Sequence, residues 1–153
     1  MIVQIGTDIV EIEKLKYSVT KEPFASDPFI RHTFTEKEIR LALLRSDPLS
    51  FFATRFAGKE AVFKALNITG EDVRLSEIEI LSQENGRPYV SLYGSAKETA
   101  KALGINNMHL SLSYEDHYAI AFAVASFISS VIWVACASNA PRKIPGKAIT
   151  LFT

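Results

Sequence analysis

The alternation of apolar and polar residues changes its period several times along the chain, and each period predicts a different element. Residues 1–12 are rich in β-branched side chains and apolar on both faces, which predicts a largely buried strand. Thr35 followed by Glu38 forms a capping box, which predicts a helix running to about Arg45. Residues 51–67 carry apolar side chains at helical spacing, which predicts a second, longer helix.

The second half of the chain predicts two hairpins separated by a helix. Strand-like residues 76–82 and 89–93 flank an Asn-Gly turn, which is typical of a tight hairpin. Residues 95–104 begin with Ser and have Glu three positions later, the pattern of a capped helix. Alternation over residues 109–114 and from Tyr118 onward predicts the second hairpin. This order, without an internal repeat, indicates an α+β fold.

The helix predicted over residues 51–67, with Ser50 as its N-cap, carries charges where an amphipathic helix is usually apolar. Its apolar stripe consists of Phe52, Phe56, Phe63 and Leu66, beside a column of Ala53, Ala57, Ala61 and Ala65. Lys59 falls inside the apolar stripe, where an ammonium group is unusual. Glu60 and Lys64 are one turn apart, so they form either an ordinary surface ion pair or part of a site that needs a second acid.

Asp8 is a candidate for that second acid. It follows Gly6 and Thr7 inside the first predicted strand, where a carboxylate is unfavourable unless it has a partner or a bulge redirects it. Aspartate is also a good N-cap, so Asp8 is equally well explained by a helix that begins near Ile9. Its position alone leaves the ligand and the cap as alternatives.

A row of polar residues occupies one face of the strand predicted over residues 109–114. His109, Ser111 and Ser113 alternate with apolar neighbours, so their side chains share one side of the sheet. Hydroxyl and imidazole groups in line can hydrogen-bond a ligand. A solvent-facing side of an ordinary strand gives the same pattern.

Composition and charge narrow the class of protein. The chain has 153 residues, enough for one domain, and 48% of them are hydrophobic, which is ample for a core. Its 17 basic and 17 acidic residues balance, so no overall field points to nucleic acid or to an anionic membrane. Cys136 is the single cysteine, so no internal disulfide forms. With no pattern of a signal peptide at its start, we expect the protein in the reducing cytoplasm.

The C-terminal part of the chain has a different composition. Residues 119–137 are almost entirely apolar, and Arg142, Lys143 and Lys147 follow them. The length approaches that of a membrane span, but the residues also suit a buried strand to about Ile128, which we favour. We therefore divide the chain into a domain of residues 1–126 and an extension of residues 127–153 whose role the sequence does not reveal.

Four segments of the sequence resemble a known family. They are Gly6-Thr7-Asp8-Ile9-Val10-Glu11-Ile12, Arg55-Phe56-Ala57-Gly58-Lys59-Glu60-Ala61 with Lys64-Ala65, Asn85-Gly86-Arg87-Pro88-Tyr89, and His109-Leu110-Ser111-Leu112-Ser113 with Tyr118-Ala119. In this order and spacing they resemble the holo-[acyl-carrier-protein] synthases, the small bacterial 4′-phosphopantetheinyl transferases. Each segment alone is weakly specific, but their combination over residues 1–124 makes chance agreement improbable.

The resemblance implies a fold and an activity. The fold is that of the 4′-phosphopantetheinyl transferases, α+β with a small antiparallel sheet packed against a long central helix, and members are typically homotrimers with active sites between subunits. The activity is the Mg²⁺-dependent transfer of 4′-phosphopantetheine from coenzyme A to a serine of an apo acyl carrier protein, releasing adenosine 3′,5′-bisphosphate. A non-enzymatic coenzyme A or nucleotide-binding module and a membrane-associated adaptor are the competing functions.

The resemblance also assigns roles to individual residues. Asp8 and Glu60 match the metal-ligand positions, and Lys64 matches a contact with the diphosphate, so these three are the expected catalytic residues. Lys64 also belongs to the expected coenzyme A site, together with Arg55, Lys59, Gly86, Arg87, Pro88, His109, Ser111 and Ser113. Either Glu60 or a metal-bound water is the general base. The family commonly has histidine where this chain has Tyr114, and a phenol carries no positive charge.

Acyl carrier proteins are acidic, so the resemblance predicts a basic docking patch. Lys14, Lys16 and Lys21, with Phe24 or Phe29 beside them, form such a patch in the sequence. For Lys59 two interpretations stay open, a contact with a coenzyme A phosphate or an ammonium that reaches water. The sequence does not identify which carrier protein is modified.

Overall fold

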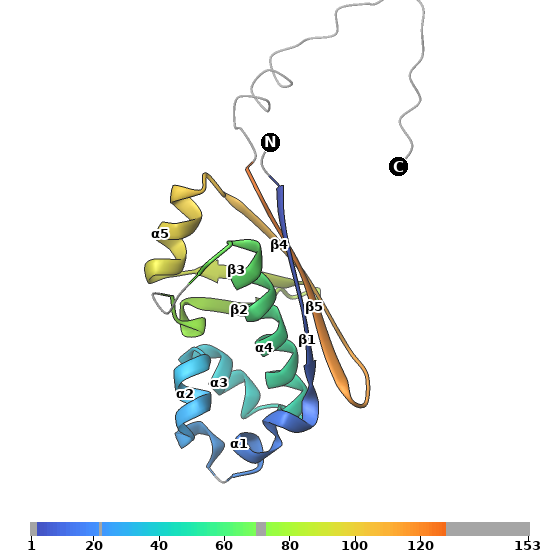
Figure 1. The fold of residues 1–153 in the computed structure, drawn as a ribbon. Helices are drawn as coiled ribbons and strands as arrows, with labels where there is room; N and C mark the ends of the chain where they lie inside the picture. Colours follow the sequence, from blue (N-terminus) through green and yellow to red (C-terminus); the bar gives the residue numbers. More distant parts are fainter. Residues whose placement is uncertain (1–2, 22, 70–72, 128–153) are drawn as a thin grey trace, which may run out of the picture.

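The protein has the α+β architecture that the sequence predicts. The computed structural model describes residues 3–21, 23–69 and 73–127. Within them, a long helix α4 (Pro48–Ala65) lies between a three-stranded sheet and the remaining elements (Figure 1). The extension predicted from residue 127 lies, beyond Phe127 itself, outside the described residues. Among the helices that the structure describes, none is both long enough and apolar enough for a membrane span.

The larger sheet joins the two ends of the described chain. Its strands are β1 (Val3–Glu11), β4 (Asn107–Tyr114) and β5 (Tyr118–Ser126). They run antiparallel in the order β1-β5-β4, so β5 is the central strand. A second, two-stranded sheet is the predicted hairpin of β2 (Ile78–Ser82) and β3 (Pro88–Leu92). Its turn includes Gly86 at φ +82°, a conformation that glycine adopts without strain.

Short helices surround α4. They are η1 (Ile12–Leu15), α1 (Lys16–Thr20), η2 (Phe24–Ser26), α2 (Pro28–Thr33), α3 (Glu36–Ala42), η3 (Leu75–Glu77) and α5 (Gly94–Ala102). The capping box predicted for α3 is present, with Thr35 and Glu38 bonded to each other's backbone amides. Helix α4 begins earlier than predicted, because Asp47 caps it by accepting from the amide of Ser50 and Pro48 occupies its first turn. The predicted Ser50 cap is wrong.

The predicted cap of α5 is also wrong. The helix begins at Gly94, and Ser95 makes no capping hydrogen bond. The amide of Ala96 donates instead to Glu77 Oε2 at 2.9 Å. A carboxylate from another element therefore accepts a hydrogen bond from an otherwise unpaired amide in the first turn of this helix. The local sequence does not reveal this contact.

The alanine column of α4 packs against the sheet. All four of its alanines are fully buried, as are Ala119, Ala123 and Ala125 of β5. Helix and sheet approach so closely that a Cβ atom on Gly6 would lie 1.9 Å from the carbonyl oxygen of Ala61. The small side chains thus allow α4 to lie directly on β1 and β5.

The opposite face of the same sheet is uncovered. Residues alternate along β1, so Val3, Ile5 and Ile9 are 48–63% exposed. Across the strand pair, Ile120 lies opposite Ile9 and Phe122 opposite Thr7, and both are 46% exposed. We call Val3, Ile5, Ile9, Ile120 and Phe122 the open sheet face. The prediction that the first strand is largely buried is wrong for the single chain, because α4 covers only one side.

Candidate active site

Asp8 and Lys64 meet on the side of the sheet that faces α4. Asp8 lies opposite Ala121, a fully covered position of β5, and its side chain is only 15% exposed. Lys64 Nζ is 2.8 Å from Asp8 Oδ1 and 3.1 Å from the carbonyl oxygen of Thr7. β1 continues in regular register through Asp8, so the alternatives of an N-cap and of a bulge are both wrong. Lys64 forms its ion pair with Asp8, which contradicts the simple Glu60–Lys64 surface pair.

Glu60 lies one turn before Lys64 on α4 and is half-buried. Burial raises the pKa of its carboxyl group, and the negative charge of Asp8 raises it further, while Lys64 acts in the opposite direction. Two carboxylates from a strand and a helix thus repel each other across this corner of the molecule. A cation shared between them would remove that repulsion.

The donor set suits Mg²⁺. The described residues hold no cluster of three or more His, Cys, Asp or Glu side chains that could bind a metal ion. Asp8 and Glu60 are the candidate pair of carboxylates, since the charge of one raises the pKa of the other. Mg²⁺ commonly takes one or two protein carboxylates and completes its shell with water and substrate phosphate. The residues present fit such a shared ion.

Glu60 also lines a cavity of about 430 Å³ beside α4. The other lining residues are His32, Thr33, Phe63, Val73, Arg74 and Leu75. Arg74 and His32 are exposed and face the same cavity as Glu60, and sequence reasoning missed both. No local pattern marks them, because they reach the Glu60 cavity only where α2 packs against η3 and η3 packs against α4.

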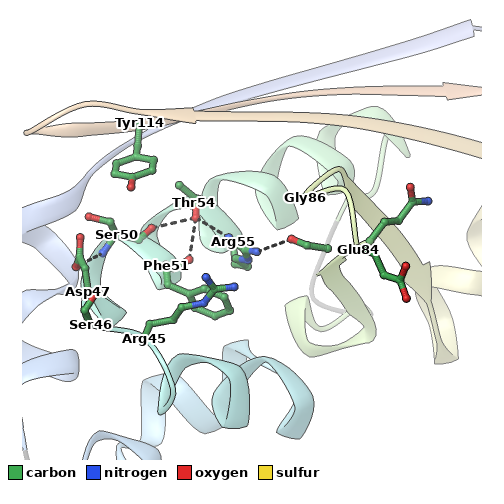
Figure 2. Close-up of a pocket in the computed structure, with 12 residues that line it drawn as sticks. Arg45, Ser46, Asp47, Ser50, Phe51, Thr54, Arg55, Glu84, Gly86 and Tyr114 are labelled. Atoms are coloured by element: carbon green, nitrogen blue, oxygen red, sulfur yellow. Dashed lines mark hydrogen bonds between the residues drawn. The ribbon is translucent and has the colours of Figure 1, made fainter.

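Arg55 lies in a second and larger cavity, of about 540 Å³, near the start of α4 (Figure 2). Its guanidinium stacks over the ring of Phe51 at 4.1 Å and donates to Thr54 Oγ1 and Ser82 Oγ, both at 3.2 Å. Burial lowers the pKa of Arg55, and the neighbouring charge of Arg45 lowers it further. Its Nε atom is buried without a hydrogen-bond partner.

The Arg55 cavity gathers several other polar groups. Gly86 and Tyr114 line it, as does Arg45, which sequence reasoning did not select (Figure 2). Arg87 is exposed in the β2–β3 turn, where its amide donates to Asn85 Oδ1, and Pro88 begins β3. The guanidinium groups of Arg45 and Arg55 can bind a phosphate group, and the carboxylates of Asp47 and Glu84 line the same cavity.

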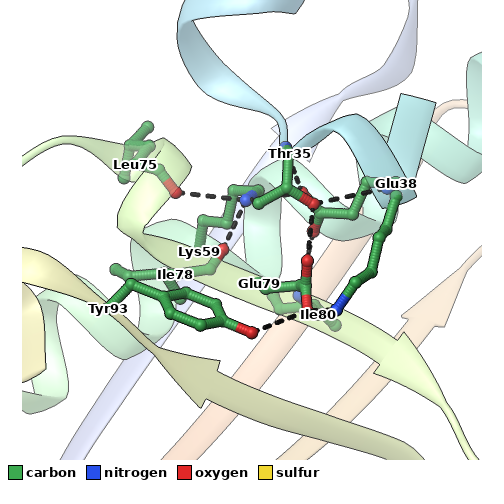
Figure 3. Close-up of polar contacts among 9 residues, drawn as sticks. Thr35, Glu38, Lys59, Leu75, Ile78, Glu79, Ile80 and Tyr93 are labelled. Carbon is green, nitrogen blue, oxygen red and sulfur yellow. Dashed lines mark hydrogen bonds and ion pairs between the residues drawn. The ribbon is translucent and has the colours of Figure 1, made fainter.

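Lys59 lies in the protein core. Its side chain is fully buried, and its ammonium is 2.8 Å from Glu38 Oε2 (Figure 3). It also donates to the carbonyl oxygens of Leu75, at 3.1 Å, and Ile78. The interpretation that its ammonium reaches water is wrong, because no part of the side chain is exposed. A nitrogen so enclosed has no surface for a coenzyme A phosphate, so we leave Lys59 out of the site.

The polar row of β4 is separated from Asp8 by the sheet itself. His109, Ser111 and Ser113 pair with Val124, Phe122 and Ile120, so they share the open sheet face. All three are exposed, and His109 Nε2 is 2.6 Å from Asn107 Nδ2. Asp8 lies on the other side, facing α4. Within one chain the predicted site residues therefore divide between two faces.

The predicted docking patch is only partly exposed. Phe24 is buried against Phe52 and is unavailable to a partner, whereas Phe29 is 38% exposed. Lys14 and Lys16 are exposed but lie close to Glu11 and Glu13, at 3.7 Å and 2.6 Å. Lys21 lies over the ring of Tyr17, which is 76% exposed.

Comparison with known proteins identifies the family and the fold. The model of the 4′-phosphopantetheinyl transferase superfamily matches residues 4–123. The holo-[acyl-carrier-protein] synthase of Clostridium novyi (strain NT) is 43% identical over 124 residues, which cover 81% of this chain and 87% of that protein. The holo-ACP-synthase of Plasmodium yoelii matches the fold with a TM-score of 0.71 at 28% identity, over 84% of this chain and 98% of that one.

A structure that contains a ligand is similar as well. The ACPS–CoA complex of Chronobacterium ammoniagenes has a TM-score of 0.70 at 25% identity and covers 84% of this chain and 100% of that one. Sequence, family model and fold thus agree over the described domain. The chain belongs to the 4′-phosphopantetheinyl transferase superfamily and is an enzyme of the holo-[acyl-carrier-protein] synthase type.

Proposed function

We propose that this enzyme transfers 4′-phosphopantetheine from coenzyme A to a serine of an acidic apo acyl carrier protein, with Mg²⁺ bound and adenosine 3′,5′-bisphosphate released. The observation that carries the proposal is the meeting of Asp8, Glu60 and Lys64 at one corner between β1 and α4. Phosphoryl transfer depends mainly on positioning and on neutralising the charge of the phosphate oxygens. Asp8 and Glu60 would meet these requirements by binding a metal ion, and Lys64 by binding a phosphate oxygen.

In the proposed reaction, the serine oxygen of the carrier protein forms a bond to the phosphorus that bears the pantetheine arm. The bond from that phosphorus to the bridging oxygen breaks, and adenosine 3′,5′-bisphosphate leaves with the bonding electrons. A bound Mg²⁺, held by Asp8 and Glu60, would neutralise negative charge on the diphosphate. Lys64, whose side chain is 51% exposed, would bind a diphosphate oxygen as a point charge.

The proton of the serine hydroxyl must go to a base. Glu60 is one candidate, since its raised pKa makes it a better proton acceptor than an ordinary surface glutamate. Water at the site is the other candidate. If water accepts the proton, Glu60 would orient that water, because Glu60 is a half-buried carboxylate that lines the cavity beside α4.

Coenzyme A carries additional phosphate, and the Arg55 cavity is the proposed place for it. Arg45 and Arg55 both line this cavity, and their guanidinium groups are the proposed contacts for a phosphate there. The complex of the Chronobacterium ammoniagenes protein with CoA is a similar fold that binds this coenzyme. Arg87, Pro88 and the polar row of β4 stay proposed contacts.

We further propose a homotrimer with active sites between subunits, as the family resemblance implies. The open sheet face supports this, because large apolar side chains gather there without cover in the single chain. Its neighbouring residues His109, Ser111 and Ser113 lie behind the sheet from Asp8. In a trimer they would contribute to the site of an adjacent subunit. The reducing cytoplasm is the proposed location of the enzyme.

An intact-mass assay tests the proposed transfer. The full chain is incubated with coenzyme A, Mg²⁺ and an apo carrier protein, and the expected result is a carrier heavier by one phosphopantetheine group. Chelation of the metal should stop the reaction, and adenosine 3′,5′-bisphosphate should accumulate in equal amount. If folded enzyme modifies none of several carriers but still binds coenzyme A, a binding module replaces the transferase. Detergent-phase partitioning of the protein would favour the membrane-associated adaptor.

A further inference from the structure

The buried ion pair of Glu38 and Lys59 connects segments that are far apart in sequence. Glu38 lies in the first turn of α3 and belongs to its capping box. Its Oε2 atom accepts a hydrogen bond from the backbone amide of Thr35 at 2.8 Å. Its other oxygen accepts the amide of Ile80 in β2 at 2.9 Å. Lys59 of α4 completes the pair at 2.8 Å (Figure 3). The pair therefore ties α3, β2 and α4 together inside the core.

Lys59 also holds the wall of the Glu60 cavity. Its ammonium donates to the carbonyl oxygen of Leu75 at 3.1 Å, and Leu75 lines the cavity that contains Glu60. Lys59 and Glu60 are successive residues of one helix, so their side chains diverge by about 100°. One points into the core and the other into the cavity. The side chain of Lys59 thus links α4 to the η3 wall of the Glu60 cavity.

Stability alone does not explain a buried pair at this position. Desolvation of two charges offsets most of their attraction, and replacing such a pair by apolar residues of similar size is often neutral or stabilising. Both side chains have no exposed surface, so the desolvation is complete. The neighbouring ring of Phe34, 5.5 Å from the ammonium, could pack equally well against an apolar side chain. The benefit of the pair is therefore geometric.

We propose that the Glu38–Lys59 pair is a positioning pair, which sets the geometry of the Glu60 cavity and hence the affinity of the site for Mg²⁺ with coenzyme A. This inference rests on the proposed function, because it takes Glu60 as part of the metal site. Groups that orient metal ligands from behind typically contribute about 10–100-fold to metal affinity or activity. Lys59 acts through the backbone of Leu75 and through α4, without touching the substrate.

The decisive variant removes the charge from both partners. In Lys59→Met alone, Glu38 is left as an unpaired buried carboxylate, so we expect a large loss of thermal stability. Glu38→Gln combined with Lys59→Met removes the unpaired charge but leaves one oxygen for the backbone amides of Thr35 and Ile80, so its Tm should lie between those of Lys59→Met and the wild type. Two readouts follow: the Mg²⁺ concentration for half-maximal transfer, and the Kd of coenzyme A with Mg²⁺ present, measured by calorimetry without turnover.

Two control variants separate positioning from stability. Ile105→Ala empties a buried position beside α5, away from the Glu60 cavity, and should lower Tm while leaving both constants unchanged. Lys37→Met removes an exposed lysine of α3 that lies 3.2 Å from Glu79 of β2. It should change neither the Mg²⁺ concentration for half-maximal transfer nor the Kd of coenzyme A. In the double variant we expect both constants to rise about 10–100-fold.

Wild-type constants in a stable double variant would overturn the positioning role. If the double variant does not fold, Lys59→Gln, which keeps a donor, is measured in the same way against Ile105→Ala. Equal constants in those two variants would also overturn the proposal. Failure of the proposed function looks different: wild-type enzyme would add no mass to any carrier, while calorimetry would still show whether the pair affects coenzyme A binding.

Discussion

The two faces of the three-stranded sheet have similar strands but opposite environments. On one face, alanines and Gly6 allow α4 to lie directly on the strands, and Asp8 reaches Lys64 across that contact. On the other face, Ile9, Ile120 and Phe122 are uncovered, beside the polar row of β4. The covered face holds the ion pair of Asp8 and Lys64, whereas the open face exposes large apolar side chains. The difference teaches that a single chain brings together the candidate residues of the covered face, whereas the polar row of β4 lies apart from them.

The largest effect is expected from the carboxylates of the covered face. Asp8→Asn and Glu60→Gln should each reduce the rate of transfer by about 10³-fold or more, because each removes a charge that is proposed to hold the metal ion. Circular dichroism should show intact folding, since neither side chain is part of the apolar core. Intact-mass kinetics provides the rate. A variant that keeps near-full rate would refute the shared metal.

A charge on the open face should separate the subunits. Phe122→Asp places a carboxylate among exposed apolar residues, so we expect light scattering to report monomers and the rate of transfer to fall about 100-fold. The matched control is Leu44→Asp, at an apolar residue that is 82% exposed and away from the sheet. If Phe122→Asp and the wild type have the same mass in solution, the open face is not the interface.

The Arg55 cavity should affect binding more than chemistry. Arg55→Met removes a charged group with several hydrogen-bond donors, so KM for coenzyme A should rise about 10-fold while kcat changes little. This is the result expected when the lost contact binds the ground state and the transition state equally well. Arg31→Met is the control, because Arg31 is an exposed arginine 4.0 Å from Glu36. A fall in kcat with unchanged KM would place Arg55 at the reacting phosphate instead.

The smallest effect concerns the pH dependence of stability. The folded pKa of Glu60 lies above the ordinary value of 4.5, so between these two values the folded state binds more protons than the unfolded state. Stability therefore falls as pH rises through that window. Without metal, Glu60→Gln should raise Tm above pH 7 by on the order of 1–2 °C, since Glu60 is half-exposed and screened.

Scanning calorimetry across pH checks this sign. Below pH 4.5 the difference between Glu60→Gln and the wild type should vanish, because Glu60 is then protonated in both states. Added Mg²⁺ should stabilise the wild type more than the variant at neutral pH. A variant that is less stable than the metal-free wild type at pH 8 would contradict the raised pKa.

Local patterns predicted the elements well. The capping box at Thr35, the Asn-Gly hairpin and the alternation of β4 all correspond to features of the structure, since each depends on neighbours in sequence. Prediction failed where a residue distant in sequence caps a helix, because the carboxylate of Glu77 accepts the hydrogen bond from an amide in the first turn of α5. The prediction that β1 is largely buried also failed, because the pattern of apolar residues does not show whether a helix covers one face of a strand or both.

For the site, the sequence by itself selected the candidate residues and, through the four segments, determined the family. The comparisons confirm the family, while the roles of the individual residues stay predictions. Only the tertiary structure decided that Lys64 pairs with Asp8, that Lys59 belongs to the core with Glu38, and that the polar row lies behind the sheet. The physical reason is that charge pairing and burial depend on distances between elements, which are set by how small side chains let α4 pack on the strands.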